Sequence, residues 1–227
     1  MYSALCPASR HGRQPRKKPL NPSSNSRFDF DGLAAAYDAW YETDTGRRHD
    51  AAQQEIVLTL LPTPTAGKRN LLLDVGCGTG RWSVFFAKQG FEVTGIDIAP
   101  QMISTGRARN ALHCRFEVAD AMRLPFPNGT FDMVAAMATL EFLSDASRAC
   151  TEMMRCLKRG GWLLIGTLNR LARINRERIA ARSEPYVSAH MFTPEELRDL
   201  LASFGETNIL ATAEHESGLG DEETMMI

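Results

Sequence analysis

A glycine-rich turn between a buried strand and a helix start constrains this chain more than any other feature. Residues 74–80 read Asp-Val-Gly-Cys-Gly-Thr-Gly. The preceding run, Leu71–Val75, is short and apolar, which is typical of a strand buried on both faces. Glycines in such a turn let the backbone approach a ligand closely, and the following helix N-terminus offers free N–H groups to an anion. The sequence therefore predicts a strand–loop–helix unit that binds a carboxylate or phosphate.

The chain continues as an alternation of strands and helices. We expect strands at 71–75, 91–96, 114–119, 131–137 and 162–168, with 206–213 as a candidate sixth. Helices are expected at 80–89, from Pro100, at 144–158, and from a capping box at 193–196. Strands separated by helices imply right-handed crossovers and a mostly parallel sheet. The predicted fold is a three-layer α/β/α sandwich, Rossmann-like, with six or seven strands.

The two ends of the chain differ in charge from its middle. Residues 1–27 hold six Lys or Arg and no acid, and four prolines, so we expect a disordered basic tail. Residues 214–227 hold five acids and no base, and we expect an acidic tail there. Between them, residues 28–213 form the predicted domain, which begins with two cover helices within residues 31–61.

Acidic residues end three consecutive predicted strands. Asp74 precedes the glycine loop, Asp97 comes 21 residues after Gly76, and Asp120 ends the third strand. In a doubly wound sheet the second of these acids faces a ribose, whose hydroxyls donate to it. The third would accept from an adenine amino group. Together the loop and the acids predict a nucleoside ligand.

The glycine spacing separates two kinds of nucleoside site. The dinucleotide fingerprint is GxGxxG, whereas this loop reads GxGxG. The loop resembles motif I of the class I S-adenosylmethionine-dependent methyltransferases, and residues 93–102, 119–126, 131–134 and 157–161 resemble their later motifs. The resemblance covers about residues 28–213 and is closest to the small-molecule group related to the ubiquinone and menaquinone enzymes, methyltransferase type 11.

This resemblance implies S-adenosylmethionine as the cofactor and a role for each matching residue. Gly76, Gly78 and Gly80 would line its methionine end, and Asp74 would hold its amino group, directly or through water. Asp97 would bind the ribose, while the adenine would meet Ile98, Met102, Asp120 and Ala121. The remaining implied contacts are Met137 beside the methionyl group and Tyr37 closing over the cofactor.

The residues that act on the methyl acceptor are less determined by the sequence. A methyl transfer needs alignment and exclusion of water, and a general base only for some nucleophiles. Glu141, after the fourth strand, and His190, before the last helix, are the catalytic candidates. Each also has a structural interpretation, as a helix-capping acid and as a loop histidine bonded to backbone. No metal-ligand cluster is evident, so no metal site is predicted.

One departure from the resembled family concerns the end of the sheet. Relatives usually finish with an antiparallel strand pair, and no convincing seventh strand follows the last predicted helix. The sheet edge would then be open, or covered by another chain. This departure also favours an alternative function, a catalytically degenerate S-adenosylmethionine-binding regulatory subunit. A nicotinamide-dependent oxidoreductase is the third hypothesis, and the early third glycine opposes it.

Composition limits the location and the partners. The formal net charge is −1, from 26 bases and 27 acids, so bulk charge predicts no specific nucleic-acid binding. The 5 cysteines form no CxxC pair, which favours reduced thiols and a cytoplasmic location. No apolar run reaches the length of an ordinary membrane span. We expect a small-molecule acceptor as the partner, no integral membrane association, and a monomer or homodimer.

Overall fold

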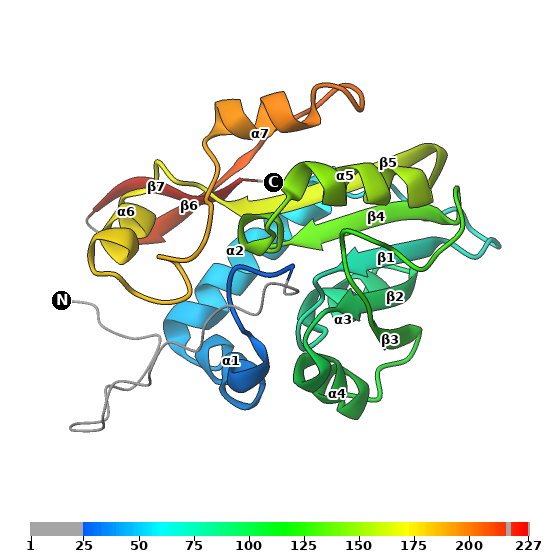
Figure 1. The fold of residues 1–227 in the computed structure, drawn as a ribbon, viewed down its shortest axis with the longest axis horizontal. Coiled ribbons are helices and arrows are strands. Elements are labelled where there is room, and N and C mark those ends of the chain that lie inside the picture. Colours follow the sequence, from blue (N-terminus) through cyan, green and yellow to red (C-terminus); the bar gives the residue numbers. More distant parts are fainter. Residues whose placement is uncertain (1–24, 217–218, 227) are drawn as a thin grey trace.

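The computed structural model describes residues 25–216 and 219–226 (Figure 1). The helices are η1 (Asp31–Leu33), α1 (Ala34–Tyr41), α2 (Asp44–Leu60), α3 (Arg81–Lys88), α4 (Pro100–Ala108), η2 (Leu140–Phe142), α5 (Ala146–Cys156), α6 (Arg173–Ala180) and α7 (Pro194–Leu201), of which η1 and η2 are 3₁₀ helices. The strands are β1 (Leu71–Val75), β2 (Glu92–Asp97), β3 (Cys114–Val118), β4 (Phe131–Met137), β5 (Leu157–Leu168), β6 (Ala211–Glu216) and β7 (Leu219–Met226).

One sheet organises the fold, in the strand order β3-β2-β1-β4-β5-β7-β6. Strands β1 to β5 are mutually parallel, and β7 pairs antiparallel with both β5 and β6. The predicted α/β Rossmann-like class is confirmed. The order of strands reverses between β1 and β4, and ligands of such sheets bind beyond the carboxyl ends of the strands at this point.

Side-chain alternation along the central strands explains why helices cover both faces. In β1, Leu72 packs in the cluster under α2 and α3, whereas Leu73 and Val75 pack in the cluster under α5 and α7. In β4, Met133 joins the first cluster and Val134 the second. Because successive side chains of a strand point to opposite faces, a strand that is apolar throughout requires a helical layer on each side.

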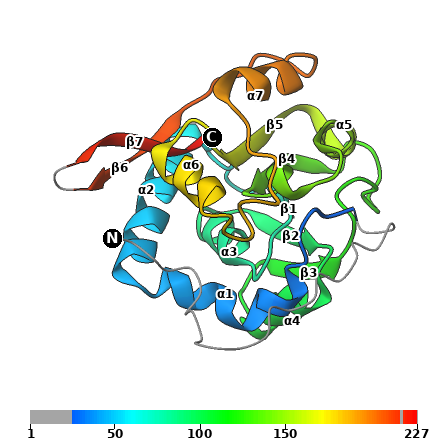
Figure 2. The same cartoon turned by 60° about the vertical axis from the view of Figure 1, so that its left-hand side comes forward.

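The C-terminal region corrects the prediction of an acidic tail from residue 214. Residues 211–216 and 219–226 form the antiparallel hairpin of β6 and β7, which Figure 2 shows extending away from the rest of the fold. The predicted strand over 206–213 begins later, at Ala211, and continues to Glu216. Strand β7 also corrects the prediction that no seventh strand follows the last helix, since it pairs with β5 and with β6. Backbone pairing defines this hairpin, and its mostly polar sequence contains no apolar run that indicates a strand.

The N-terminal region also corrects a prediction, that of a disordered tail reaching residue 27. Residues 1–24 lie outside the described residues, but residues 25–30, called here the N-terminal strap, are bonded to the loop after β4. The N–H of Arg27 donates to the carbonyl of Phe142 at 2.6 Å, and that of Ser144 donates to Asn25 at 3.1 Å. These contacts join residues more than a hundred positions apart, so local composition did not indicate them.

The predicted cover helices within 31–61 are present as η1, α1 and α2. Thr43 separates α1 from α2 by capping the second helix, since its hydroxyl accepts from the N–H of Gly46. The capping box predicted at 193–196 is confirmed: Thr193 and Glu196 exchange hydrogen bonds at the start of α7. Among the described residues, no helix has the length and apolar character needed to cross a membrane.

Candidate cofactor site

The glycine loop follows β1 at the point where the strand order reverses. All three glycines have left-handed backbones, with φ of +70° at Gly76, +53° at Gly78 and +82° at Gly80. A Cβ on Gly76 would overlap Thr139, and one on Gly80 would overlap the ring of Phe116. At Gly78, by contrast, no protein atom lies within 4 Å of such a Cβ. Gly76 and Gly80 are therefore required by packing, and Gly78 leaves the loop open to a ligand.

Asp97 ends β2 and is bonded to this loop. Its Oδ2 accepts from the N–H of Gly78 at 2.9 Å, and its Oδ1 accepts from that of Ala99 at 2.9 Å. Burial raises the pKa of Asp97, while these N–H donors counteract the shift. The carboxylate is thus fixed beside Gly78, the glycine of this loop that faces open space, where the sequence predicted a ribose.

Asp74 is fully buried at the end of β1. Its Oδ2 accepts from the hydroxyl of Ser83 in α3 at 2.6 Å. Burial is the main cause that raises its pKa to about 7. The side chain joins the strand to the helix behind the loop, and its contact with the cofactor amino group stays a prediction.

Asp120 follows β3 and is held at both oxygens. Its Oδ1 accepts from the N–H of Met122 at 2.9 Å, and its Oδ2 accepts from the side-chain amide of Asn25. Ala121, beside it, is buried. The sequence predicted that Asp120 accepts from an adenine amino group, and the structure shows that the amide of the strap uses the same carboxylate.

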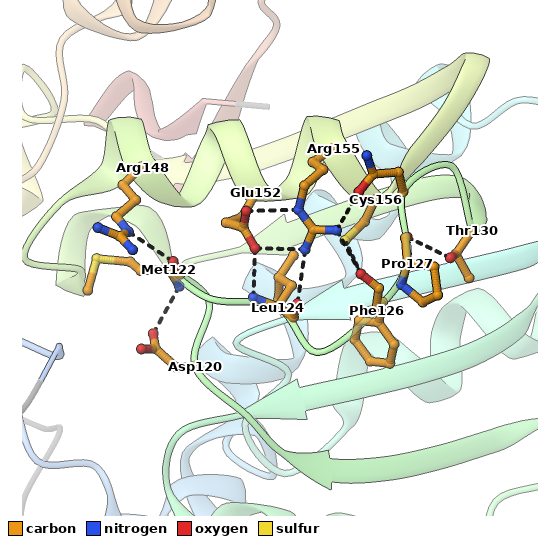
Figure 3. A network of polar contacts seen from close by, with 11 residues as sticks. Asp120, Met122, Leu124, Phe126, Pro127, Thr130, Arg148, Glu152, Arg155 and Cys156 are labelled. Carbon is orange, nitrogen blue, oxygen red and sulfur yellow. Dashed lines mark hydrogen bonds and ion pairs between the residues drawn. The ribbon is translucent and has the colours of Figure 1, made fainter.

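A network from α5 holds the loop that carries Asp120 (Figure 3). Glu152 accepts from the N–H of Leu124 at 2.9 Å and pairs with Arg155 at 2.8 Å. Arg155 donates in turn to the carbonyls of Leu124 and Phe126, at 2.9 and 2.7 Å. Since one ion pair bonds several backbone groups of the loop, the position of Asp120 is tied to the helix packed under the sheet.

The two residues predicted to pack on adenine differ in exposure. Ile98 is 42% exposed, whereas Met102 is 1% exposed and packs with Phe30, Ala34 and Tyr37. The strap and α1 therefore cover Met102 and leave Ile98 open. Adenine would meet Ile98 directly and would reach Met102 only where this cover leaves room.

Helix α1 is clamped to the glycine loop by residues that the sequence did not indicate. The hydroxyl of Thr79 donates to Asp38 at 2.7 Å, Arg109 pairs with Asp38, and Nε of Arg109 donates to the carbonyl of Thr79 at 2.6 Å. Asp38 lies 41 positions from Thr79 and 71 from Arg109. No local spacing connects such residues, so the clamp becomes visible only in the fold.

The clamp sets Tyr37 and Tyr41 beside the site. Their rings lie 5.8 Å apart, and the neighbouring Tyr41 and burial raise the pKa of Tyr37 well above its ordinary value, with a smaller contribution from Asp97. Arg81 stacks at 3.8 Å over the Tyr41 ring and pairs with Asp50 at 2.7 Å. Tyr37 is thus a neutral phenol near the carboxylate predicted to bind ribose, and its closure over the cofactor stays a prediction.

Glu141 and His190 come together where β4 and β5 end. Glu141 is fully buried and accepts from Thr167 and from the N–H of Leu168, each at 3.1 Å. Its carbonyl accepts from the N–H of His190 at 2.7 Å, and the His190 side chain is exposed. Burial raises the pKa of Glu141 to about 7. Met137, the last residue of β4, is buried, and its predicted contact with the methionyl group stays a prediction.

Comparison with known proteins finds similarity to methyltransferases. Residues 73–165 match the family model described as a methyltransferase domain. The chain is 32% identical over 162 residues to a ubiquinone biosynthesis O-methyltransferase of Xanthomonas campestris, covering 66% of each protein. It is 31% identical over 149 residues to a malonyl-[acyl-carrier protein] O-methyltransferase of Serratia marcescens, covering 64% of this chain and 56% of that one.

A solved structure extends the likeness to most of the fold. A methyltransferase of Thermotoga maritima, described as S-adenosylmethionine-dependent and as a possible histamine N-methyltransferase, superposes with a TM-score of 0.69 at 25% identity, covering 87% of this chain and 95% of that one. The chain belongs to the class I S-adenosylmethionine-dependent methyltransferases of the small-molecule type, and S-adenosylmethionine is the cofactor of this class. It spans between about half and two thirds of the two curated relatives named above.

Proposed function

We propose that this chain transfers the methyl group of S-adenosylmethionine to a small-molecule nucleophile by direct in-line displacement. The observation that supports this most is the bond from the N–H of Gly78 to Asp97 at 2.9 Å. This bond holds the Asp97 carboxylate, which we expect to bind the ribose, beside Gly78, whose Cβ side faces open space. Both residues lie at the point of the sheet where nucleotides bind. A glycine loop bonded to an acid in this way fits a nucleoside cofactor that has a methionine end.

When bound, the cofactor supplies an electrophilic methyl on a sulfonium. The chain would contribute orientation and exclusion of water. Asp97 would hold the ribose, Ile98 and Asp120 would hold the adenine, and Tyr37 would close over the cofactor. Of the two catalytic candidates, the exposed imidazole of His190 would take the proton of the acceptor, and buried Glu141 would position the loop that carries it.

An oxygen nucleophile is the acceptor we favour, with nitrogen and carbon as alternatives. Two relatives are named for O-methylation, one in ubiquinone biosynthesis and one of malonyl-acyl-carrier protein. An acceptor hydroxyl must lose its proton as its oxygen is methylated, which gives His190 a function. A carboxylic acid is already ionised near neutral pH and needs no base. We further propose that this protein is cytoplasmic, that it is a monomer or a homodimer, and that it binds no specific nucleic acid.

Calorimetric titration tests the cofactor directly. We expect the purified chain to bind S-adenosylmethionine and S-adenosylhomocysteine but not NADH. Turnover with a panel of phenols and carboxylic acids would then test catalysis. Tight binding without turnover on any acceptor would match the regulatory-subunit alternative, and binding of NADH alone would contradict the proposal.

Substitution of Asp97 tests the site at one residue. Asp97→Ala should weaken binding of S-adenosylmethionine by about 5- to 150-fold, since unpaired ribose hydroxyls cost about 1–3 kcal/mol. Glu117→Ala is the matched control, because Glu117 is an exposed acid on the neighbouring strand β3. Equal affinities in the two folded variants would remove Asp97 from this role.

A further inference from the structure

Two arginines stack on tyrosines near the predicted cofactor site, and they differ in whether an acid pairs with them. Arg81 lies 3.8 Å over the ring of Tyr41 and pairs with Asp50 at 2.7 Å. Arg178, in α6, lies 4.4 Å over the ring of Tyr186. Among the described residues, no carboxylate pairs with Arg178. Its positive charge is therefore available to an anionic ligand.

Neutral groups hold the guanidinium of Arg178 in place. Its Nη1 donates to the side-chain oxygen of Asn175 at 3.0 Å, and the side-chain amide of Asn175 donates to the carbonyl of Asn169 at 2.9 Å. Both asparagines are buried. Asn169 directly follows β5, whose last residue, Leu168, donates to Glu141. The guanidinium is thus fixed relative to the end of β5 by groups that do not neutralise its charge.

The segment 173–190, which carries this arginine, is basic, and its acids have other partners. It holds four arginines and two glutamates. Glu177 accepts from Arg173 at 2.7 Å, and Glu184 accepts from the hydroxyl of a nearby serine at 2.8 Å. Neither acid of the segment therefore neutralises Arg178.

The position of this segment places Arg178 on the side of the methyl acceptor. Helix α6 and the residues after it lie beyond the carboxyl ends of the parallel strands (Figure 1), where such sheets bind their ligands. The pKa of Tyr37 is raised by Tyr41, by burial and also by Tyr186, so the stacked tyrosine neighbours those of α1. His190, the candidate base, ends the same segment. The methionine end of the cofactor is predicted between β1 and α3, whereas α6 follows β5, two strands away.

We propose that the methyl acceptor carries, besides the atom that is methylated, a carboxylate or phosphate group that binds the guanidinium of Arg178. This inference rests on the proposed function and narrows its acceptor to anionic small molecules. The planar fork of an arginine matches such oxyanions with two parallel N–H bonds, and the contacts with Tyr186 and Asn175 keep it oriented. A cation that is oriented in advance loses little freedom on binding, so it contributes to affinity and aligns the acceptor.

Ligand-observed NMR titrations of the full chain, saturated with S-adenosylhomocysteine, test this inference without requiring turnover. The probes are hydroxylated benzoic and alkanoic acids and, for each acid, the neutral carboxamide and the phosphonate of the same skeleton. We expect the wild type to bind at least one acid or phosphonate about tenfold or more tightly than the matched amide, as charge-assisted hydrogen bonds do. The stronger of the two anions identifies which oxyanion the acceptor carries.

Substitutions in α6 assign this preference to one side chain. Arg178→Gln should remove the preference and leave the affinity for the amides unchanged. Arg178→Lys keeps the charge but loses the fork, so it should restore part of the preference. Arg176→Gln is the matched control, because Arg176 is an exposed arginine of the same helix. Calorimetry should give the wild type and all three variants the same affinity for S-adenosylmethionine.

The measurements separate failure of this inference from failure of the proposed function. A folded wild type that does not bind S-adenosylmethionine would overturn the proposed function, and the inference with it. Cofactor binding with equal affinity for every acid, phosphonate and amide would overturn the inference alone. An equal loss of preference in Arg176→Gln and Arg178→Gln would also overturn it, by indicating a generally basic surface. Weaker S-adenosylmethionine binding in Arg178→Gln would do the same, by giving this guanidinium to the cofactor.

Discussion

At the scale of single residues, two glycines of one loop have different roles: Gly76 is required by packing, and Gly78 leaves space for a ligand. Gly76 and Gly78 both have left-handed backbones, but only at Gly76 would a Cβ overlap a neighbour, Thr139. An alanine in this conformation costs about 1–2 kcal/mol on its own. Gly78→Ala should lose about that much stability, and Gly76→Ala should lose more, in urea unfolding.

Affinity should follow the opposite order. Gly78→Ala adds a methyl group where the loop faces open space, so we expect it to bind S-adenosylmethionine more weakly than its small loss of stability suggests. Gly129→Ala is the matched control, because Gly129 has φ of +63°, no atom within 4 Å of its Cβ position, and a place outside the loop. Equal affinity of the Gly78 and Gly129 variants would contradict the assignment of Gly78 to the ligand.

At the scale of elements, the N-terminal strap contacts Asp120, on the side of the site where we predict the adenine. The amide of Asn25 donates to Asp120, the carboxylate predicted for the adenine amino group. Binding would then have to break this bond, whose net value is about 0.5–1.5 kcal/mol. Asn25→Ala should therefore tighten S-adenosylmethionine binding by about 2- to 10-fold in calorimetry. Asn208→Ala, an exposed asparagine after α7, is the control; unchanged or weaker binding would separate the strap from adenine recognition.

The clamp on α1 gives a second prediction at this scale. Asp38 bonds Thr79 of the glycine loop and pairs with Arg109, so Asp38→Ala should free α1 and its Tyr37. We expect weaker cofactor binding, by about 5- to 30-fold, from groups worth about 1–2 kcal/mol, with faster amide exchange confined to 34–41. Asp44→Ala is the control, since Asp44 pairs with Arg47 at an exposed helix start. Uniformly faster exchange would indicate general destabilisation instead.

The elements that sequence predicted well are those with local causes. The apolar run of β1, the capping box of α7 and the proline at the start of α4 each lie within a few residues of the feature they specify. The strap, the clamp and the hairpin of β6 and β7 depend on contacts between distant segments. Their polar residues look like ordinary tail or surface residues until the sheet brings their partners together.

At the scale of the whole molecule, two buried carboxyls make stability depend on pH. Burial raises the pKa of Asp74 and of Glu141 to about 7, from ordinary values of 3.8 and 4.5. In that interval the folded state binds more protons than the unfolded state, so stability falls as pH rises through it. The contribution of each group is full below its unfolded pKa and is lost above about pH 7.

Glu141→Gln isolates one of the two groups. Glutamine keeps an acceptor for the N–H of Leu168 and does not titrate, while Asp74 contributes equally in both proteins. Between pH 5 and pH 8 the wild type should lose roughly 2–3 kcal/mol more unfolding free energy than Glu141→Gln, from a pKa rise to about 7. Urea unfolding at the two pH values measures this difference, with Glu117→Gln as an exposed control. Parallel pH profiles for all three proteins would show that Glu141 is already ionised in the folded state, and would return it to the site as a candidate base rather than a neutral anchor of β5.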